Sequence, residues 1–570
     1  MKSRWILPPR QQTAAAAPLT RALGISPLLA QCLANRGFAD PEPASGFLRP
    51  RLKDLGDPAS LPNMAAAVDR LLNARQRAEA LVIFGDYDVD GVTSTALLLE
   101  TLRALGWRVN YYLPHRMEEG YGLSREAAEN CLQKFPVTLL LAVDCGSTSN
   151  DTIAWLGRQG TDVIVLDHHQ VSSPPPPAAA LVNPRLAASG GEFCSAGLAF
   201  KLAHALVKRL RLEGDSPAAA FDVRQHLDLV ALGTIADLVP LTGENRILAH
   251  AGLERLSQSG RPGLNALKTV CQCPAAIRSY EVAFRLGPRL NAAGRLEDAE
   301  EALRLLLAAD LATAEPIARS LDRRNRLRQE IERAIAEEVV AAVEARFSKE
   351  TDFVIVEGRD SWHIGVIGIV ASRLVKRFHR PAIVLGGEGA SWRGSGRSIE
   401  GFDLAAALRG CDQLLVRHGG HSMAAGVTVE PSQVDPFRQR LNELARAALK
   451  PEHLEPSLRL DAEVAAQDLT EELVGQLAAL APTGQGNPPV QFLIRRLTFR
   501  QPPLRMGSNK QHARLRLTDG RNSVEAVWWN AGEVPLPDGP IDLAFSPEIN
   551  EYQGRRQVQL RLLDWRNSLP

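Results

Sequence analysis

LVIFGDYDVDGVTST, residues 81–95, joins a short apolar run to three alternating acids. Its first four residues are apolar and end abruptly at glycine and acid, which indicates a buried parallel strand, and residues 92–105 have the pattern of a helix. Asp86, Asp88 and Asp90 are therefore expected at the carboxyl end of a strand, where open α/β sheets bind ligands. An apolar core does not accept three unpaired carboxylates, so water at an exposed acidic turn or a metal ion must neutralise them.

Other apolar segments carry the same chemistry. Residues 138–143 and 163–166 read as two further strands, and they run directly into more candidate ligands: Asp144, Asp167, His168 and His169. Residues 227–241 form a helix-like apolar run with Asp228 at its start and Asp237 in its interior. Because consecutive parallel strands bring their carboxyl ends to one edge of a sheet, these side chains are expected to form a single site.

The kinds of side chain in this site indicate a class of metal. Carboxylates with one or two histidines, and no cysteine cluster, suit Mg²⁺ or Mn²⁺ rather than structural zinc. Five or six acids are more than one ion needs, which favours two divalent metal ions that together hold the attacking and leaving oxygens of a phosphate substitution. The predicted reaction is hydrolysis of a phosphoester or a phosphoanhydride.

The motifs also carry a family resemblance. The DHH phosphoesterase superfamily has four motifs, which are similar to GDYDVDGVTST, AVDCGS, LDHHQ and GTIADLVPL of this chain. Within that superfamily the chain more closely resembles the RecJ family of bacterial single-strand-specific exonucleases. That resemblance extends along nearly the whole chain through RGFADPEPASGFLRP, GPRLNAAGR, WHIGVIGIVASRL, RHGGHSMAAG and GQGNPPVQF.

The resemblance implies a function. It suggests a metal-dependent exonuclease that degrades single-stranded DNA from its 5′ end to 5′-mononucleotides in recombination and repair. Single-strand-binding protein and a helicase are the protein partners it implies, with the enzyme acting as a monomer. Two alternatives stay open at this point. One is a phosphodiesterase acting on short oligonucleotides, pyrophosphate or cyclic dinucleotides, and the other is a non-catalytic DNA-binding scaffold.

Individual roles follow from the same resemblance. Asp88, completed by Asp86, would bind one metal ion, and Asp144 would bridge to a second ion held by Asp90, His168 and Asp237. His169 would contact the scissile phosphate, with Asp167 as the other catalytic candidate. Glycines beside serine, arginine and histidine in residues 392–398 and 417–426 let backbone and cations approach an anion. The candidate substrate-binding residues are Arg116, Arg295, Ser395, Arg397, His418, Gly419, Gly420 and His421.

The expected fold class is α/β, with two doubly wound domains joined by a long helix and a carboxyl-terminal β-barrel similar to an OB fold. The expected domains are a clasp on the first domain (1–60), a DHH catalytic domain (61–302), a connecting helix (303–347), a DHHA1 substrate-binding domain (348–450) and the barrel (455–570). Pro316 should interrupt the connecting helix. The arginines of that helix between 319 and 328 are read as a solvated face or, alternatively, as a wall that follows phosphates.

Composition limits the remaining choices. The 570 residues carry 66 Lys and Arg against 65 Asp and Glu, a net charge of +1, so contact with nucleic acid must come from local patches rather than overall attraction. Trp528, Trp529 and Tyr552 could stack on bases in the barrel, although a buried tryptophan is the commoner case. The seven cysteines fit reduced thiols. We expect a cytoplasmic protein with no membrane span, and the absence of a Walker A motif argues against ATP-driven movement.

Overall fold

The computed structural model divides the chain into two compact units. Unit 1 comprises residues 1–55, 240–250 and 455–570, and unit 2 comprises residues 56–239 and 251–454. The residues that the structure describes are 3–116, 118–120, 122–187, 191–387, 389–532, 534–535, 539–552 and 554–568. The chain passes from unit 1 into unit 2 within one helix, α11 (Gly243–Ser257).

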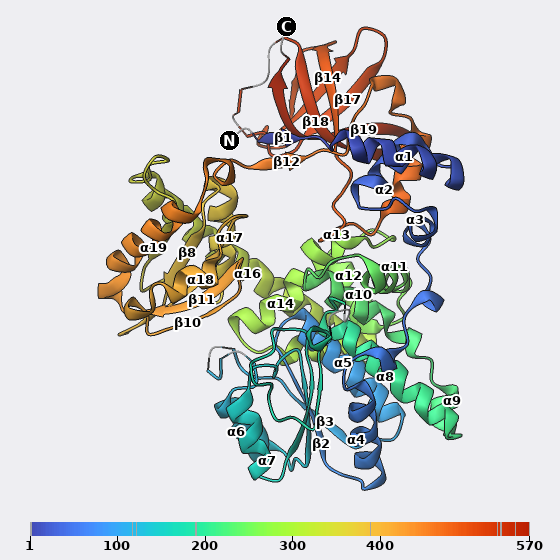
Figure 1. Cartoon of the computed structure of the whole chain (residues 1–570), viewed down its shortest axis with the longest axis vertical. Helices are drawn as coiled ribbons and strands as arrows, with labels where there is room; N and C mark the ends of the chain where they lie inside the picture. The colour runs from blue at the N-terminus through green and yellow to red at the C-terminus, as the bar shows by residue number, and fades with distance from the viewer. Residues whose placement is uncertain are drawn as a thin grey trace. The chain divides into compact units, whose positions relative to one another are not determined.

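Unit 2 begins with a five-stranded parallel sheet of order β3-β2-β4-β5-β6 (Figure 1). Its strands are β2 (Leu81–Gly85), β3 (Val109–Tyr112), β4 (Leu139–Val143), β5 (Asp162–Leu166) and β6 (Ala180–Val182). Every residue of β2 and β4 is buried, because helices cover both faces of the sheet. Strands covered on both faces have no polar alternation, which explains their uninterrupted apolar sequences.

The two faces of this sheet are covered by different helices (Figure 1). One face packs in an apolar cluster with α6 (Arg125–Lys134) and α7 (Asn150–Arg158). The opposite face carries α4 (Met64–Gln76), α5 (Val89–Ala104) and α8 (Ser195–Leu212). Helix α10 (Leu227–Ala236) packs on α5 and α8. Helices on both faces of a parallel sheet confirm the doubly wound prediction for this domain.

Further helices lead from the first sheet to the second. They are α9 (Ser216–Ala220), α12 (Pro262–Val270), α13 (Ser279–Glu281), the π-helix η5 (Val282–Leu286), α14 (Gly287–Leu296), α15 (Glu300–Leu306) and α16 (Leu311–Glu344). The predicted connecting helix therefore consists of a short helix and a 34-residue one. Its interruption lies before Asp310, whose side chain caps α16. The predicted break at Pro316 is wrong, because this proline lies inside the first turns of α16.

Four of the five arginines in the first half of α16 form ion pairs. Arg319 pairs with Glu315, Arg326 with Asp322, Arg328 with Glu332, and Arg324 with Glu297 and Glu301. The side chains of Arg319 and Arg326 are exposed, as a solvated face requires, whereas Arg328 is buried with Glu332. The ion pairs leave less support for a wall that follows phosphates, because cations already matched by carboxylates attract little further negative charge.

The second sheet of unit 2 is mixed. Its order is β10-β11-β9-β8-β7, and only β7 and β8 are parallel. Its elements are β7 (Ile355–Gly358), α17 (Ile367–Phe378), β8 (Ala382–Gly386), β9 (Trp392–Arg397), α18 (Leu404–Arg409), β10 (Arg417–Gly420), β11 (Ala424–Val429) and α19 (Val434–Ala448). Helices cover both faces, α18 and α19 on one and α17 with the end of α16 on the other. The α/β class is confirmed, with the refinement that this sheet is not parallel throughout.

Unit 1 is built around a barrel. Its seven-stranded sheet has the order β13-β14-β18-β19-β17-β16-β15, and an additional β14–β16 pairing closes it. The strands are β13 (Ala462–Glu463), β14 (Phe492–Phe499), β15 (Leu504–Met506), β16 (His512–Thr518), β17 (Ser523–Trp528), β18 (Ile541–Tyr552) and β19 (Arg555–Asn567), with α20 (Glu471–Leu477) before β14. Strand β12 (Ser457–Arg459) lies outside this sheet. Trp528 is half-buried against the barrel core. Trp529 is 49% exposed, and the Tyr552 side chain lies outside the described atoms.

The amino-terminal segment belongs to the barrel's unit. It forms β1 (Arg4–Ile6), α1 (Arg10–Leu23), α2 (Pro27–Asn35) and α3 (Pro41–Leu48). Strand β1 pairs with β12, and buried residues such as Leu19, Leu29 and Leu33 share one apolar core with barrel residues Phe492 and Phe545. The expected clasp on the first α/β domain is thus corrected, because the apolar faces of α1 and α2 are buried against the barrel.

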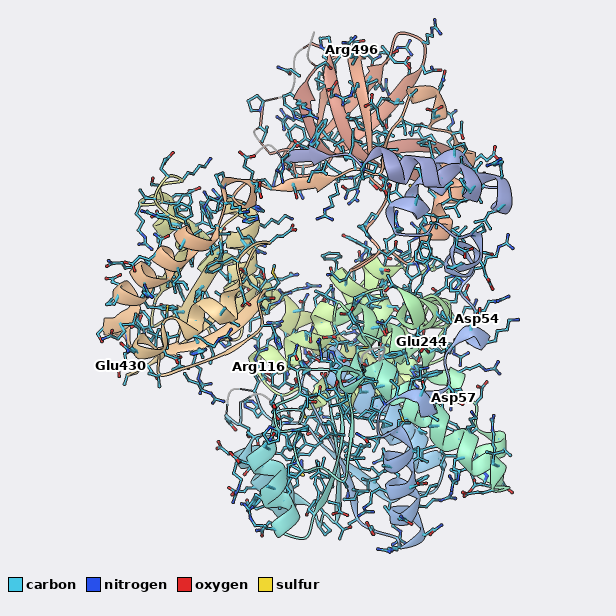
Figure 2. The ribbon with its side chains drawn as sticks, in the orientation of Figure 1. Asp54, Asp57, Arg116, Glu244, Glu430 and Arg496 are labelled. Carbon is cyan, nitrogen blue, oxygen red and sulfur yellow. The ribbon has the colours of Figure 1, made fainter. Side chains whose placement is uncertain are left out.

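Figure 2 shows the side chains of the described residues on the same ribbon, with Arg116 labelled after β3 and Glu430 after β11. Among these residues no helix combines the length and the hydrophobicity that crossing a bilayer requires.

Candidate functional site

The turn after β2 delivers the first three acids by a route that the sequence pattern did not predict. Asp88 is the N-cap of α5 and accepts hydrogen bonds from the backbone N–H of Asp90 at 2.9 Å and Gly91 at 3.1 Å. The helix therefore starts at Val89, earlier than the predicted residue 92. Asp90 projects from the first helical turn, while Asp86 ends the strand. A glycine is required at position 91, where a Cβ atom would lie 2.4 Å from the Asp86 carbonyl oxygen.

Asp90 is buried against the start of α8. Its two carboxylate oxygens accept hydrogen bonds from the backbone N–H groups of Ser195 at 2.6 Å and Ala196 at 2.8 Å. The positive end of an 18-residue helix dipole thus faces this carboxylate. Gly233 of α10 packs on the other side, where a Cβ atom would come 2.6 Å from Asp90 Oδ1.

Asp144 follows β4 and is 2% exposed. Its backbone has a left-handed φ of 65°, which aspartate and asparagine tolerate better than most residues. The Ser195 hydroxyl donates to Asp144 Oδ1 at 3.0 Å. Because Ser195 contacts both Asp90 and Asp144, the start of α8 fixes two of the predicted metal ligands.

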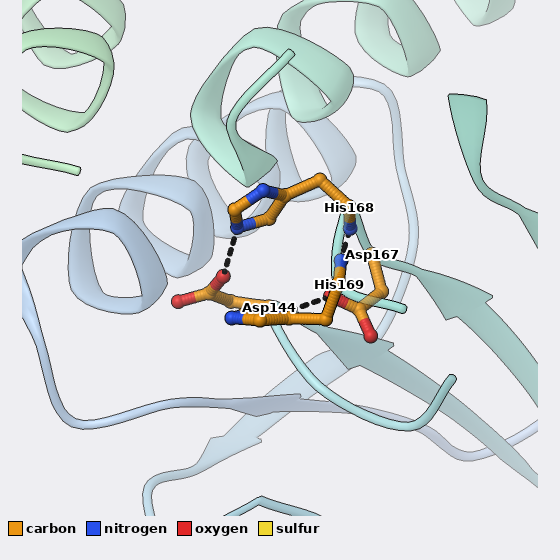
Figure 3. Close-up of side chains that lie close together, drawn as sticks. All are labelled: Asp144, Asp167, His168 and His169. Atoms are coloured by element: carbon orange, nitrogen blue, oxygen red, sulfur yellow. Dashed lines mark hydrogen bonds and ion pairs between the residues drawn. The ribbon is translucent and has the colours of Figure 1, made fainter. Parts of the chain in front are cut away.

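His168 faces the acids with one ring nitrogen (Figure 3). Its Nε2 atom lies 3.3 Å from Asp144 Oδ1, 3.6 Å from Asp237 Oδ2 and 3.9 Å from Asp90 Oδ2. This buried nitrogen has no hydrogen-bond partner among the described atoms. A buried polar atom without a partner is costly, so the position is suited to an ion held between the imidazole and the carboxylates.

His169 is held by Asp167 and lies beside Asp144, because the candidate ligand atoms of Asp144, Asp167, His168 and His169 fall within 4.8 Å of one another. Its Nδ1 lies 2.8 Å from Asp167 Oδ1, and this carboxylate also accepts hydrogen bonds from the backbone N–H of His168 at 2.8 Å and Ser147 at 3.1 Å. Asp167 therefore holds the turn that carries both histidines. Its observed contacts are those of a positioning residue.

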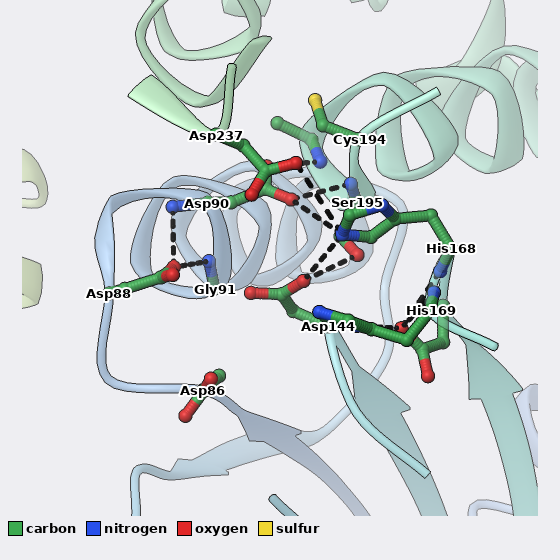
Figure 4. A network of polar contacts seen from close by, with 12 residues as sticks. Asp86, Asp88, Asp90, Gly91, Asp144, His168, His169, Cys194, Ser195 and Asp237 are labelled. Carbon is green, nitrogen blue, oxygen red and sulfur yellow. Dashed lines mark hydrogen bonds and ion pairs between the residues drawn. The ribbon is translucent and has the colours of Figure 1, made fainter. Parts of the chain in front are cut away.

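Asp237 comes from α10. It is the C-cap of this helix and not an interior residue of a longer one, so the predicted place of Asp237 deep in a helical run is corrected. Figure 4 shows Asp237 and Asp90 on one side of His168, and Asp86 and Asp88 on the far side of Asp144. Candidate ligand atoms fall within 4.8 Å of one another in three groups: Asp86, Asp88 and Asp144; Asp90, His168 and Asp237; and Asp144, Asp167, His168 and His169.

Asp228, at the start of the same helix, lies elsewhere. It is buried and bonded to Ser259 at 2.7 Å and to Arg261 at 3.2 Å. Arg261 in turn binds Glu100 of α5 through two hydrogen bonds of 2.7 Å. Asp228 therefore joins α10 to α5 and is not one of the metal-ligand candidates.

Burial and mutual repulsion perturb the carboxyl groups strongly. Burial, then the charge of Asp88, raises the pKa of Asp86 to about 8 and that of Asp90 to about 6. Burial, then Asp90, raises the pKa of Asp237 to about 9 and lifts the pKa of Asp144 well above its usual range. A site that raises several carboxyl pKa values together needs positive charge to ionise them, which a divalent cation supplies.

The two histidines are shifted in opposite directions. Burial, then the nearby charge of His169, lowers the pKa of His168 to about 4, so its imidazole is neutral and can act as a ligand. Burial alone would lower the pKa of His169, but the hydrogen bond and charge of Asp167 outweigh burial and raise it to about 9. His169 is therefore a cation at neutral pH.

Three predicted substrate-binding arginines lie near one another, and two of them, Arg116 and Arg295, also lie near these acids. Arg295 donates to the Gly365 carbonyl at 3.1 Å, and burial, then the charge of Arg116, lowers its pKa to about 10. Burial, then Arg116 again, lowers the pKa of Arg397. Arg116 lies 5.1 Å from the ring of Tyr87, next to Asp86. Neighbouring guanidinium groups that depress one another's pKa values form a site for an anion.

The glycine-rich segments are strands and not loops. Ser395 and Arg397 lie on β9, where Arg397 donates to Ser395 Oγ at 3.0 Å. Gly368, in the first turn of α17, approaches both, since a Cβ atom there would lie 2.9 Å from Ser395 Oγ and 3.1 Å from Arg397 Nη2. The anion-binding role predicted for residues 392–398 therefore falls on a strand beside a helix N-terminus.

The remaining candidates on β10 separate into two kinds. His418 pairs with Asp412, and Gly419 and Gly420 expose their backbone on the same strand. The next residue, His421, is influenced by the first domain, because burial and then the charge of His169 lower its pKa. The structure therefore brings His421 toward the metal-ligand candidates, and gives His418 a partner in its own domain.

Several side chains of the site were not predicted. Ser195 holds two acids, Asn183 donates to Ser147 Oγ and to the His169 carbonyl, both at 2.9 Å, and Asn291 accepts from the Val89 N–H at 3.1 Å. Gly233 stands in GTIADLVPL, where only the aspartate was considered. A polar residue just before an apolar helical run is a helix-start signal, which could have singled out Ser195 but not its partners.

Comparisons with known proteins identify the domains of the chain. Residues 80–234 match the model of the DHH family, N-terminal domain, residues 351–447 match the DHHA1 domain, and residues 460–564 match the RecJ OB domain. Single-stranded-DNA-specific exonuclease RecJ of Bacillus subtilis is 37% identical over 555 residues, which are 96% of this chain and 69% of that protein. RecJ of Salmonella typhimurium is 34% identical over 560 residues, with 95% and 96% covered.

A solved structure shows the same fold. The crystal structure of RecJ in complex with Mn²⁺ from Thermus thermophilus superposes with a TM-score of 0.84 at 32% identity, covering 100% of this chain and 80% of that one. RecJ from that organism has also been solved with Mg²⁺. Full-length similarity at this level, together with the DHH, DHHA1 and OB matches, shows that the chain belongs to the RecJ family of single-stranded-DNA-specific exonucleases.

Proposed function

We propose that this protein is a metal-dependent exonuclease that removes 5′-mononucleotides from the 5′ end of single-stranded DNA, acting in recombination and repair. The observation that carries the proposal is the buried group of carboxylates around the unpartnered Nε2 atom of His168. A scaffold without catalytic activity would have no use for buried acids, because each one destabilises the fold unless it is neutralised.

The residues fit two divalent ions, Mn²⁺ or Mg²⁺. Asp86, Asp88 and Asp144 would hold one ion, and Asp90, His168 and Asp237 the other. The 3.3 Å distance between Asp144 Oδ1 and His168 Nε2 supports Asp144 as the bridge. Hard oxygen donors with one imidazole suit these metals. When bound, such ions supply an activated water and stabilise negative charge on the phosphate.

The chain's own residues orient the substrate around that centre. His169 would contact the scissile phosphate and stabilise the charge that develops on it. Asp167 holds the ring through Nδ1 and thereby fixes which nitrogen faces the substrate. Ser195 and the N-terminus of α8 keep Asp144 and Asp90 in place.

The 5′ end would be recognised by the second domain. Ser395 and Arg397 lie beside Gly368 at the N-terminus of α17, where helix dipole, hydroxyl and guanidinium together suit a terminal phosphate. Arg116 and Arg295 would contact phosphates nearer the metal ions. His421 and the exposed backbone of Gly419 and Gly420, on and directly after β10, would add contacts to the DNA strand.

The test uses single-stranded DNA labelled separately at each end. With Mn²⁺, we expect mononucleotides to appear first from the 5′ label and long products to persist from the 3′ label, and chelation should stop both. Release from the 3′ end would overturn the polarity. Turnover of dinucleotides alone would instead assign the chain to the phosphodiesterases of short oligonucleotides.

Partners are inferred on the same basis. We infer that single-strand-binding protein and a helicase deliver the substrate, and that the enzyme acts as a monomer. Sedimentation of the protein alone measures its oligomeric state, and sedimentation with purified single-strand-binding protein tests whether the two proteins form a complex. In the barrel, the exposed ring of Trp529 stays a candidate for base stacking.

A further inference from the structure

Two aromatic rings stand exposed side by side in unit 2. Tyr280 is 58% and Phe284 66% exposed, and their ring centroids are 5.0 Å apart with an angle of 35° between the planes. A single exposed apolar side chain needs no explanation. Two touching rings form an apolar surface, and they forgo the roughly 1.5–3 kcal/mol that burying one such side chain contributes.

The pair is held on a rigid helical segment. Helices α13, η5 and α14 follow one another without a break, and their inner face is buried through Val282, Leu286 and Leu290. Pro288 has no N–H to offer the carbonyl of Phe284 four residues earlier. The preceding Gly287 N–H bonds to the carbonyl of Val282, the wider spacing of a π-helix, a form that recurs at functional sites.

The same segment leads into the metal centre. Asn291 of α14 accepts a hydrogen bond from the N–H of Val89, which lies between two metal-ligand candidates. Gly294 packs closely under Tyr87, and a Cβ atom there would lie 2.7 Å from its carbonyl oxygen. Phe284 precedes Asn291 by seven residues, or about 10 Å at 1.5 Å per residue. The rings therefore lie a short distance from the acids, along one helix.

The charges around the rings suit a polyanion. Residues 278–289 contain three arginines and one acid. That acid, Glu281, is buried and accepts a hydrogen bond from the backbone N–H of Arg278. Arg289 is already paired with Asp322, so the cations available beside the rings are Arg278 and Arg285. Arg278, beside Tyr280, is exposed. Aromatic rings interleaved with cations are the combination by which proteins hold single strands without regard to sequence.

We propose that Tyr280 and Phe284 form a stacking platform for bases of the single-stranded substrate, a few nucleotides from the bond that is cleaved. The proposal rests on the proposed function and adds to it a binding site outside the metal centre. Because the two rings would stack on any of the four bases, they would help to hold a strand of any sequence in place while its end is removed.

The first experiment measures binding of the full chain to single-stranded oligonucleotides of increasing length in EDTA, so that no cleavage occurs. Stacking contributes about 1–3 kcal/mol per base, so Phe284→Leu with Tyr280→Leu should weaken binding of long strands by about 5- to 150-fold, and that of dinucleotides by much less. Leu212→Ala, a change at an 80% exposed residue at the end of α8, is the matched control and should bind as the wild type does.

The second experiment asks whether a base is the partner of the rings. An abasic nucleotide is moved along the strand, and affinity is measured for the wild type and for Phe284→Leu. At one or two positions the abasic site should weaken wild-type binding and leave the variant unaffected, and Phe284→Trp should restore the wild-type pattern. If the abasic site and Phe284→Leu each weaken binding independently at every position, the rings do not stack on a base and the proposal is overturned.

Other outcomes are equally decisive. Equal weakening at all lengths would show that the variant disturbs α14 and that the rings have a structural role. Unchanged DNA binding with loss of a protein complex would assign the rings to a protein partner and overturn the proposal. If the wild type binds long strands but releases no nucleotides, the proposed exonuclease function is wrong. The stacking platform is still tested separately by the series of abasic strands.

Discussion

The two sheets of unit 2 place charge in opposite ways. At the carboxyl edge of the first, parallel sheet, Asp86, Asp90 and Asp144 are each no more than 2% exposed, and backbone N–H groups and a neutral imidazole surround them. The second, mixed sheet carries the half-buried Arg397 on β9 and the exposed glycines Gly419 and Gly420 on its edge strand β10, which His421 follows. A parallel sheet covered on both faces can bury carboxylates at strand ends and so bind cations. An antiparallel edge leaves backbone and side chains accessible to a long anion.

The largest effect should come from Asp144, the acid that we propose is shared by both ion sites. Asp144→Asn keeps the shape of the side chain and tolerates the left-handed φ of 65°, which alanine would not. Because the bridging charge is lost, kcat should fall by about 10³-fold or more. We would measure kcat with saturating Mn²⁺, and circular dichroism would confirm the fold. Near-normal turnover would show that Asp144 is not the bridge.

Without metal ions, repulsion between the buried carboxylates of the first sheet should make the free energy of unfolding depend on pH. Unfolded aspartates have pKa values of about 3.9, whereas those of folded Asp90, Asp86 and Asp237 are about 6, 8 and 9. Between about pH 4 and pH 9 the folded metal-free protein holds protons that the unfolded chain has released, so its stability should fall as pH rises through this window.

Adding Mn²⁺ should reverse that loss. At a concentration of 100 Kd one ion stabilises the fold by about 2.7 kcal/mol. At pH 7 binding of both ions should release protons from Asp86, Asp144 and Asp237, whose pKa values are raised. Calorimetry in buffers of different ionisation enthalpy counts these protons, and urea titrations at several pH values give the stability. Binding without proton release would contradict the raised pKa values.

A smaller effect is expected on the anion-binding side. If Arg397 holds a 5′-terminal phosphate, Arg397→Gln removes a charge-assisted hydrogen bond of about 1.5–3 kcal/mol. The preference in kcat/KM for 5′-phosphorylated over 5′-hydroxyl DNA should then drop by about 10- to 150-fold. Arg409→Gln, at the exposed end of α18, is the control. Equal losses on both substrates would give Arg397 a structural role.

The smallest effect should follow from His418→Asn. This histidine already pairs with Asp412 at the surface of its own domain, and exposed pairs contribute little, about 1 kcal/mol or less. Activity on long single strands should change by less than about fivefold. His421→Asn, measured beside it, should lose more, because His421 lies within the influence of His169. The reverse ranking would move the DNA contact from His421 to His418.

The sequence indicated the first sheet well for a local reason. An apolar run that stops at an acid marks a strand end, and parallel strands gather such ends at one edge. This is why Asp86, Asp144 and Asp167 could be placed together from the pattern alone. The second sheet was harder, since glycine, serine and arginine fit either a loop or a strand. The packing of the amino-terminal clasp, residues 1–60, was predicted wrongly. The apolar pattern of a helix shows that one face is buried, but it does not show which domain covers that face.

The order of residues in the chain was enough to show that aspartates and histidines follow the strands of the first sheet. It therefore indicated the negative charge and the metal-binding chemistry of the candidate site. Tertiary structure alone decided the geometry of these side chains. Ser195 reaches Asp90 and Asp144 across 105 and 51 residues, and Asp237 arrives from a helix end. The physical reason is range: strand and helix signals act over a few residues, whereas hydrogen bonds between side chains far apart in sequence exist only once packing has brought their elements together.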